Sequence, residues 1–467
     1  MPCCYGDCFW DVTKRLMWWC KDEKVCYTDA DGKDYCIFHA PQGKKQVTLK
    51  KFNGLIFERI KKAKEKKERC DLSGTILEGD IDFRHFNKDN HLPYIDFSSV
   101  QFSGNANFAE AVFSGNASFA EAVFSGNASF AEAVFSGEVF FDSAEFRGHA
   151  DFAEAVFREY VDFWWVWFNE YADFSLCHIS EKAKLDFRSF ERAKTFRKGA
   201  GFSDLDIEGF IKFDGVDLSN VPFADTKLSK IDFVNVRWHK SGWGGWRDFL
   251  YDEIALFEKI KKGSVPEEER PKTLYTDYLD FKQWMKRTFL YAERYGDNIR
   301  KVEILYRGMK DKYRNLQNWP AVSNWHYGEK EMYRKENAFR RYCPFSISFL
   351  YWLSSGYGER YMKAGIVLAA LIFIVSFGLG WTGLDAVPRY GANPGHFHGI
   401  TSITLETLNL KSIGALLINT MKYATFQKDI FFIPRNMLGD IIRAVAQILI
   451  PLQTALFILA VRNRFRR

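Results

Sequence analysis

Large apolar residues recur between Val100 and Phe174 at steps of six and then five positions. The repeating unit is 11 residues long, as in FSGNASFAEAV, and each phenylalanine has a small aliphatic residue two positions before it. Mostly Ser, Gly, Asn and Glu fill the positions between them. The recurring residues are Phe102, Phe108, Phe113, Phe119, Phe124, Phe130, Phe135, Phe141, Phe146, Phe152, Phe157, Phe163, Phe168 and Phe174.

This spacing fits neither a helix nor a flat strand. Steps of five and six would scatter over all sides of a 3.6-residue helix, and a period of two cannot hold them on one face. The step becomes strictly five from Phe213 to Trp238, and weaker copies precede the main run at Leu72, Leu77 and Phe83. The pattern therefore predicts a solenoid that turns a corner about every five residues, with one large and one small inward residue on each face.

These units resemble the Phe-centred variant of the pentapeptide-repeat family over about residues 70–240. The resemblance implies a right-handed quadrilateral β-helix with four faces per coil. Each coil would lengthen the rod by about one strand spacing, ~4.8 Å. The fold class expected for the whole chain is therefore a multidomain β + α membrane protein, in which this β-helix is followed by helices.

The charge of the repeats has two interpretations. Residues 96–174 hold 13 acidic and 2 basic side chains, although the whole chain carries a net charge of +6. Some members of the family are acidic rods that mimic DNA. We favour a solvated outer face, because the acidic run stops after Lys182, and we expect no nucleic-acid partner.

Cysteines cluster ahead of the repeats, and residues 1–45 are predicted to form a zinc knuckle. No secretory signal is evident, which favours metal binding over disulfides. Zn²⁺ takes four Cys or His ligands, and the pair in YCIFH lies within one turn. The predicted structural ligands are Cys8, Cys26, Cys36 and His39, with Cys4 and Cys20 as alternates; cysteines that bind no metal are the competing interpretation.

Basic residues dominate the next segment, 46–69, in which Phe52, Ile56 and Ile60 recur every four positions. This spacing predicts an amphipathic helix. We interpret it as a cap that closes the first coil, because solenoids need polar ends. Attachment to a membrane or to nucleic acid through the basic face is the alternative.

Residues 241–345 form a helical connector. Glu331 and Lys335, like Glu336 and Arg340, are four positions apart, which is typical of ion pairs on a solvated helix surface. We assign no chemistry to this region.

Two apolar runs in residues 346–467 predict a membrane hairpin. Residues 364–384 and 444–461 are uncharged and each long enough to cross a ~30 Å hydrocarbon core. Basic residues flank both outer ends, which places both termini in the cytoplasm of a prokaryotic cell.

The segment between the two runs is similar in arrangement to a two-transmembrane ion-channel module. Residues 412–424 are too short to cross and fit a re-entrant or pore-type helix. The filter position would be Thr425, Phe426 and Gln427, which lack the glycines of a potassium filter. The GYG at 356–358 precedes the first run, so we expect it to be a tight turn.

The second apolar run contains three polar or helix-breaking residues, Gln447, Pro451 and Gln453. Intramembrane amides seek partners on other helices, and such residues often line a pathway or an oligomer contact. Because the two glutamines are six apart, they do not share one helix face.

These features predict an integral membrane protein without a catalytic motif. The leading hypothesis is a channel-like homo-oligomer whose cytoplasmic β-helix is a sensor or gate. The alternative is a membrane-anchored scaffold that presents the β-helix to a protein partner, and a DNA mimic is the least favoured.

Overall fold

The computed structural model describes residues 23–189, 195–240, 247–261, 281–337 and 340–465, the last range without 342, 344, 388–399, 401, 405, 407–408 and 429. The chain divides into two compact units, Met1–Ser264 and Val265–Arg467. Each unit is described by itself.

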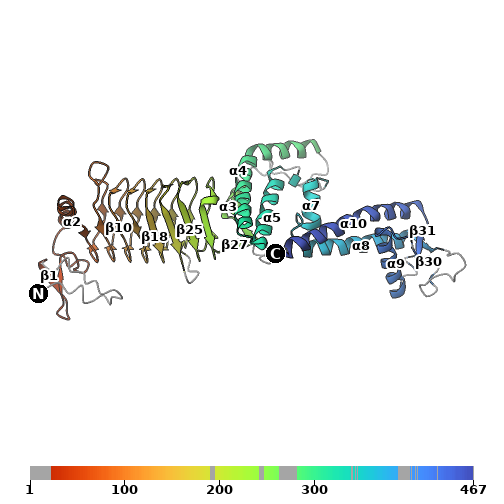
Figure 1. Ribbon diagram of the computed structural model, residues 1–467, viewed down its shortest axis with the longest axis horizontal. Helices are drawn as coiled ribbons and strands as arrows, with labels where there is room; N and C mark the ends of the chain where they lie inside the picture. The colour runs from red at the N-terminus through yellow and green to blue at the C-terminus, as the bar shows by residue number, and fades with distance from the viewer. Residues whose placement is uncertain are drawn as a thin grey trace. The chain divides into compact units, whose positions relative to one another are not determined.

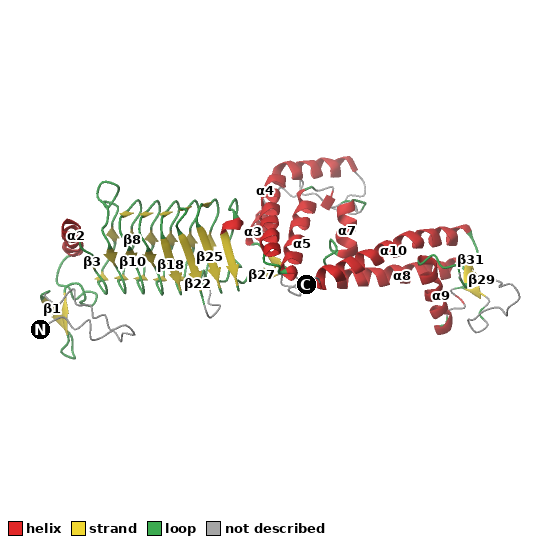
Figure 2. Ribbon diagram, in the orientation of Figure 1, coloured by secondary structure: helices red, strands yellow, loops and turns green. Residues whose placement is uncertain are grey.

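The first unit is a β-solenoid of short parallel strands, as Figures 1 and 2 show. The longest of its four parallel sheets has eight strands, so the chain makes about seven turns. That sheet contains β3 (Cys70–Asp71), β6 (Ile95–Asp96), β10 (Ala117–Ser118), β14 (Val139–Phe140), β18 (Tyr160–Trp164), β22 (Lys184–Arg188), β25 (Phe210–Asp214) and β26 (Ile231–Val234). The predicted fold class is confirmed.

The other three sheets have five, six and five strands. The second holds β4 (Ile76–Leu77), β7 (Gln101–Phe102), β11 (Val123–Phe124), β15 (Glu145–Phe146) and β19 (Trp167–Phe168). The third holds β5 (Ile81–Asp82), β8 (Ala106–Asn107), β12 (Ala128–Ser129), β16 (Ala150–Asp151), β20 (Ala172–Asp173) and β23 (Ala200–Gly201). The fourth holds β9 (Val112–Phe113), β13 (Val134–Phe135), β17 (Val156–Phe157), β21 (His178–Ile179) and β24 (Asp206–Ile207).

Stacked phenylalanines fill the solenoid. Two 11-residue units make one coil, because Ala117 pairs with Val139, 22 positions later. The ring of Phe130 therefore lies parallel to those of Phe108 and Phe152, with centroids 4.9 Å away in both directions. The rings of neighbouring sheets meet edge to face, and the inward-facing phenylalanines of these coils are fully buried. This ladder is the core predicted from the spacing.

A helix covers the start of the solenoid, and another helix follows its end. At the start, α2 (Leu49–Lys66) buries Phe52, Ile56 and Ile60, and its Phe57 ring meets Phe83 of the first coil edge to face. Thr48 caps its N-terminus by accepting a hydrogen bond from the Lys51 amide. At the other end, the hairpin of β27 (His239–Lys240) and β28 (Asp248–Phe249) leads into α3 (Tyr251–Lys261).

The second unit begins with two packed helices, α4 (Phe281–Asn315) and α5 (Trp319–Glu336). Tyr306 and Trp325 are buried between them, with ring centroids 5.9 Å apart. A Cβ at Gly328 would lie 2.4 Å from the Tyr306 ring, so glycine is required for this close approach.

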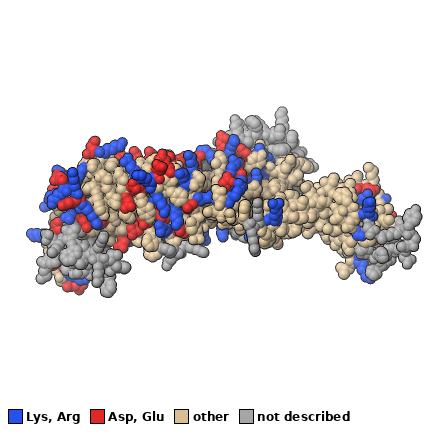
Figure 3. Space-filling view, in the orientation of Figure 1, with Lys and Arg blue, Asp and Glu red and all other residues tan. Residues whose placement is uncertain are grey.

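The C-terminal part consists of α7 (Ile347–Ser355), α8 (Tyr361–Thr382), α9 (Leu410–Ala424) and α10 (Met437–Phe465). Its three-stranded sheet is made of β29 (Leu384–Ala386), β30 (Ser402–Ile403) and β31 (Phe432–Pro434). Only α8 and α10, among the helices of the described ranges, are long and apolar enough to cross a membrane. Their side chains form an almost uncharged surface on the face drawn in Figure 3.

The predicted run 444–461 falls inside α10, whereas the run 364–384 extends two residues past the end of α8. Gly383 adopts φ +82° and ends α8, and Leu384 already belongs to β29. Helix α10 begins seven residues before the predicted run, at Met437, and includes Asp440 and Arg443. The sequence analysis did not predict α7 or the small sheet.

Candidate functional site

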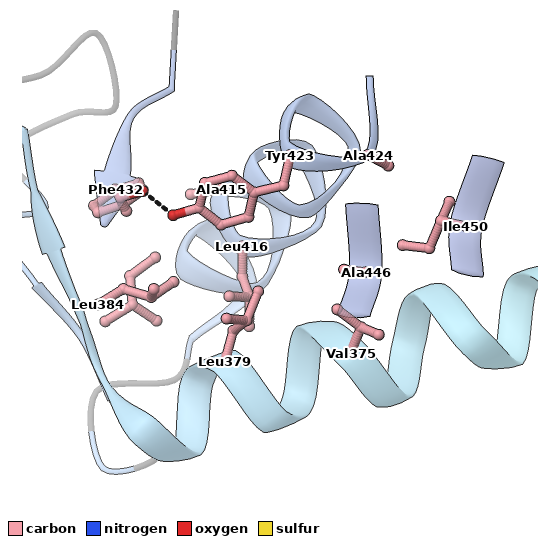
Figure 4. Packing of buried hydrophobic residues seen from close by; sticks show 11 residues of the cluster. Val375, Leu379, Leu384, Ala415, Leu416, Tyr423, Ala424, Phe432, Ala446 and Ile450 are labelled. Atoms are coloured by element: carbon pink, nitrogen blue, oxygen red, sulfur yellow. Dashed lines mark hydrogen bonds between the residues drawn. The ribbon is translucent and has the colours of Figure 1, made fainter. Parts of the chain in front are cut away.

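The helix between the two apolar helices packs against both of them. Val375 and Leu379 of α8, Leu416 of α9 and Ile450 of α10 belong to one buried cluster. Figure 4 shows Leu379 and Leu416 side by side in this cluster. Across the same contact, Ser376 Oγ donates a hydrogen bond to Thr420 Oγ1 at 2.9 Å. Helix α9 is thus a fixed part of the hairpin.

A fully buried amide, Asn419, joins α9 to the strand that returns toward α10. Its Oδ1 accepts hydrogen bonds from the amides of Phe431 at 3.0 Å and Phe432 at 3.1 Å. Its Nδ2 donates to the carbonyl of Phe432 at 3.1 Å, and the hydroxyl of Tyr423 donates to the same oxygen, as the dashed line in Figure 4 marks. Sequence analysis missed Asn419, although a lone amide in an apolar segment is a usable signal.

The predicted filter residues form an exposed turn after α9. Thr425, Phe426 and Gln427 are all exposed, and Phe426 adopts φ +55°. Further along the chain, the carbonyls of the return strand are already bonded, since Phe431 O accepts from Val387 N and β31 pairs with β29. A potassium filter needs a row of carbonyls directed at the ion. The carbonyls of Phe431 and Phe432 are not available for that purpose.

The polar residues of α10 have different environments. Gln453 is buried, and its Nε2 donates to the carbonyls of Ser354 and Ala364, both at 2.9 Å. Gln447 is half-buried and Pro451 lies inside the helix. The carbonyls that Gln453 binds stand at the end of α7 and the start of α8, so this amide connects three helices.

A buried ionic group lies ahead of α8. Arg334 Nη2 is 2.8 Å from Glu331 Oε1, and the hydroxyl of Tyr357 donates to Glu331 Oε2 at 2.9 Å. Burial alone would raise the pKa of Glu331, but the hydrogen bond and the charge of Arg334 outweigh it and hold that pKa below its usual range. The expectation that Glu331 and Lys335 form a solvated surface pair is wrong for Glu331, because its side chain is buried. The Lys335 ammonium group is 3.6 Å from the Glu331 carboxylate, which is farther than the Arg334 guanidinium group.

The GYG segment is a turn, as expected. Gly356, Tyr357 and Gly358 adopt φ of +55°, +62° and +73° in succession. This left-handed backbone is strained for tyrosine, and it directs Tyr357 into the ionic group of Glu331 and Arg334.

Two of the four predicted zinc ligands lie together. Cys36 Sγ and His39 Nδ1 are 3.2 Å apart, and His39 Nε2 is 3.1 Å from the carbonyl of Ser73. A histidine that donates to a carbonyl through one nitrogen presents the other to a metal. Cys8 lies outside the described residues, and within them no three His, Cys, Asp or Glu side chains form a group able to hold a metal.

A lysine that sequence analysis did not single out organises the same turn. Lys45 is buried, and its ammonium group donates to the carbonyls of Ile37, Phe38 and Ala40 at 2.7–3.1 Å. Burial lowers the pKa of Lys45 to about 8. These bonds order residues 37–40 independently of a metal.

Comparison with known proteins bears on the solenoid. A family model described as pentapeptide repeats (9 copies) matches residues 97–144 and 119–165. The expected resemblance is therefore confirmed for this stretch of the chain. A search of curated proteins finds no match, and neither does a search of solved structures.

Proposed function

From the pentapeptide-repeat solenoid and the apolar helix pair, we propose that this chain is an integral membrane protein with a channel-like, homo-oligomeric membrane module. Helices α8 and α10 cross the bilayer, and α9 has the place of a pore-type helix. The apolar side chains of Phe373, Ile374 and Ile448 are 64–67% exposed, which suits contact with lipid or with a second copy.

One observation carries this proposal: the order span, short packed helix, return strand, span, held together by Asn419. An isolated anchor needs only two helices. Here a third helix packs against both spans, and a buried amide fixes the strand that follows it. Two spans cannot enclose a pore, so the module requires several copies.

The basic residues at the outer ends of the two apolar helices support an orientation with both termini in the cytoplasm of a prokaryotic cell. Arg360 and Lys363 stand at the start of α8, and Arg462 and Arg464 at the end of α10. The solenoid is then a cytoplasmic sensor or gate. We propose no catalytic role.

A membrane-anchored scaffold is the second candidate, and an aromatic patch on the solenoid favours it. Trp164, Trp165 and Trp167 are 40–53% exposed on the surface of the solenoid. Trp165 occupies the corner where Glu121 and Ser143 stand in earlier coils, and a bulky residue at its φ of +54° is strained. A protein partner could bind this patch. The carbonyls of β31 already accept hydrogen bonds within the chain, which agrees better with an anchor than with a potassium filter.

Two measurements separate these candidates. A channel-like module predicts a symmetric oligomer by native mass spectrometry in detergent and currents in planar bilayers. A monomer that stays silent across ions and voltages would exclude it. A scaffold predicts that an unrelated two-span anchor can replace residues 346–467 without loss of function.

A structural zinc ion at the N-terminus remains part of the proposal. The Cys36 thiol and the His39 Nδ1 atom would supply two ligands, with Cys8 and Cys26 completing the set. Zinc would cross-link residues 1–45 and carry no chemistry. Elemental analysis of the purified full chain should find one zinc per chain, less in Cys36→Ser, and unchanged in Cys177→Ser, a buried thiol inside the solenoid. Absence of zinc from the wild type contradicts the proposal.

A further inference from the structure

The second unit contains a cavity that none of the proposed functions uses. Its volume is about 200 Å³. It lies between α4, α5, the turn before α8 and the last turn of α10. Its lining residues are Lys310, Arg314, Trp319, Val322, Ser323, His326, Glu359 and Asn463.

A buried carboxylate, Glu359, lies within this cavity. Ser323 Oγ donates to Glu359 Oε2 at 2.6 Å, and Asn463 Nδ2 lies 3.4 Å from Oε1. The Nε2 atom of His326, also in the lining, is 3.9 Å from Oε1. Burial raises the pKa of Glu359, because these partners only partly replace the water that the carboxylate has lost. The group would be stabilised by a cation in the cavity.

The lining also contains two basic residues, and one of them, Arg314, is open to solvent. The Arg314 side chain is 53% exposed, and its pair with Asp311, at 3.2 Å, is equally exposed. Such surface pairs are weak, so Arg314 can turn to a ligand at little cost. Lys310 is held by Glu329 at 2.5 Å, and Trp319 and Val322 supply an apolar wall. The lining therefore combines a buried negative charge with an exposed positive one.

We propose that this cavity binds a small ligand with a primary ammonium group close to a carboxylate or phosphate. The ammonium group would donate to Glu359 and the anionic group would meet Arg314. An amino acid and a phosphoethanolamine lipid headgroup share this chemistry. The volume lies below that of a typical drug-sized site, which suits a ligand of this size. A lone inorganic anion does not fit, since Glu359 would repel it.

Ligand binding here would be sensed by both apolar helices. Glu359 stands two residues before α8, and Asn463, in the last turn of α10, also donates to the carbonyl of Gly358 at 3.0 Å. The binding site does not depend on whether the module conducts ions.

Calorimetric titration of the full chain in an amine-free detergent buffer tests the site. The probes are O-phosphoethanolamine, glycine, ethanolamine and inorganic phosphate. We expect phosphoethanolamine or glycine to bind more tightly than ethanolamine, and phosphate not to bind. Glu359→Gln should weaken the binding of every ammonium probe about ten- to a hundredfold, which is the usual effect of losing a charged hydrogen-bond partner. Glu336→Gln, whose carboxylate pairs with Arg340 outside the lining, is the matched control and should bind as the wild type does.

The exposed Arg314 provides a variant that keeps the protein folded. Arg314→Gln should weaken the binding of phosphoethanolamine or glycine and leave the binding of ethanolamine unchanged. Binding of glycine identifies a free amino acid, whereas stabilisation by phosphatidylethanolamine nanodiscs and not by phosphatidylcholine ones identifies a lipid headgroup. The proposal is overturned if no ammonium probe binds, if phosphate binds equally well, or if Glu359→Gln and Arg314→Gln both bind like the wild type.

Discussion

A single carboxylate at the C-terminal end of the solenoid should give it a measurable pH dependence. The Asp252 side chain is buried and accepts the Phe223 amide at 3.0 Å, and burial raises its pKa from 3.8 to about 6. The folded protein binds the proton of the Asp252 carboxyl more tightly than the unfolded chain does. This difference stabilises the fold in full below pH 3.8, and the stabilisation is lost as the pH rises through about 6.

Asp252→Asn should therefore lose this pH-dependent part of the stability, while its amide oxygen still accepts a hydrogen bond from the Phe223 amide. Relative to the variant, the wild type should become less stable between pH 4 and pH 7, by up to about 3 kcal/mol. Thermal unfolding followed by circular dichroism at both pH values measures the difference. Asp204→Asn, at an exposed position, is the control. A constant difference across this range would show that Asp252 does not titrate as described.

A residue could be predicted from the sequence where a pattern among its near neighbours in the chain reveals its role. The inward phenylalanines and alanines repeat every few positions, so periodicity identified them. Lys45, Asn419 and Tyr357 act through partners fixed only by the fold: the Tyr357 hydroxyl binds a carboxylate 26 positions earlier. No local pattern marks such pairs.

The stacking of coils makes certain corner glycines irreplaceable. A Cβ at Gly126 would lie 2.6 Å from the carbonyl oxygen of Gly104 in the preceding coil, and one at Gly148 would lie 2.4 Å from that of Gly126. Backbone atoms cannot move aside as side chains can. Gly126→Ala should therefore cost the solenoid about 1–3 kcal/mol.

The melting temperature of the solenoid, measured by circular dichroism near 218 nm, tests this expectation. The matched control is Gly414→Ala in α9, where an added Cβ meets nothing within 4 Å. That change should be neutral or slightly stabilising, because alanine favours a helix. An unaffected melting temperature in Gly126→Ala would mean that the coils are not this close.

The contact between α9 and the return strand should depend on Asn419. Asn419→Leu keeps the side-chain size but leaves the amides of Phe431 and Phe432 without their partner. Each buried polar group left unpaired costs about 1–3 kcal/mol. We expect faster hydrogen exchange in residues 430–434, measured by mass spectrometry, and no such change in Gln427→Leu, at an exposed position. Equal exchange in both variants would contradict the assigned role.

Elements were predictable in proportion to their length and periodicity. The segment expected as a short helix at 412–424 is α9, which begins two residues earlier because Asn409 and Ser412 form a capping box. The sheet of β29, β30 and β31 could not be foreseen. Its strands have two or three residues each and pair across gaps of up to 50 positions.

For the whole molecule, the decisive question is whether exposed apolar side chains on α10 face lipid. Ile448 is 67% exposed near the middle of the helix, and Met437 is 79% exposed at its first residue. On the surface of a soluble protein, both positions would accept arginine equally well. In a bilayer, arginine near the centre costs about 2.5–3.5 kcal/mol, whereas one at the end reaches the headgroups. Ile448→Arg should therefore reduce the share of protein that resists alkaline extraction from membranes, and Met437→Arg should not. Equal behaviour of the two variants would mean that α10 does not cross the bilayer, and the channel-like module and the membrane-anchored scaffold would both have to be abandoned.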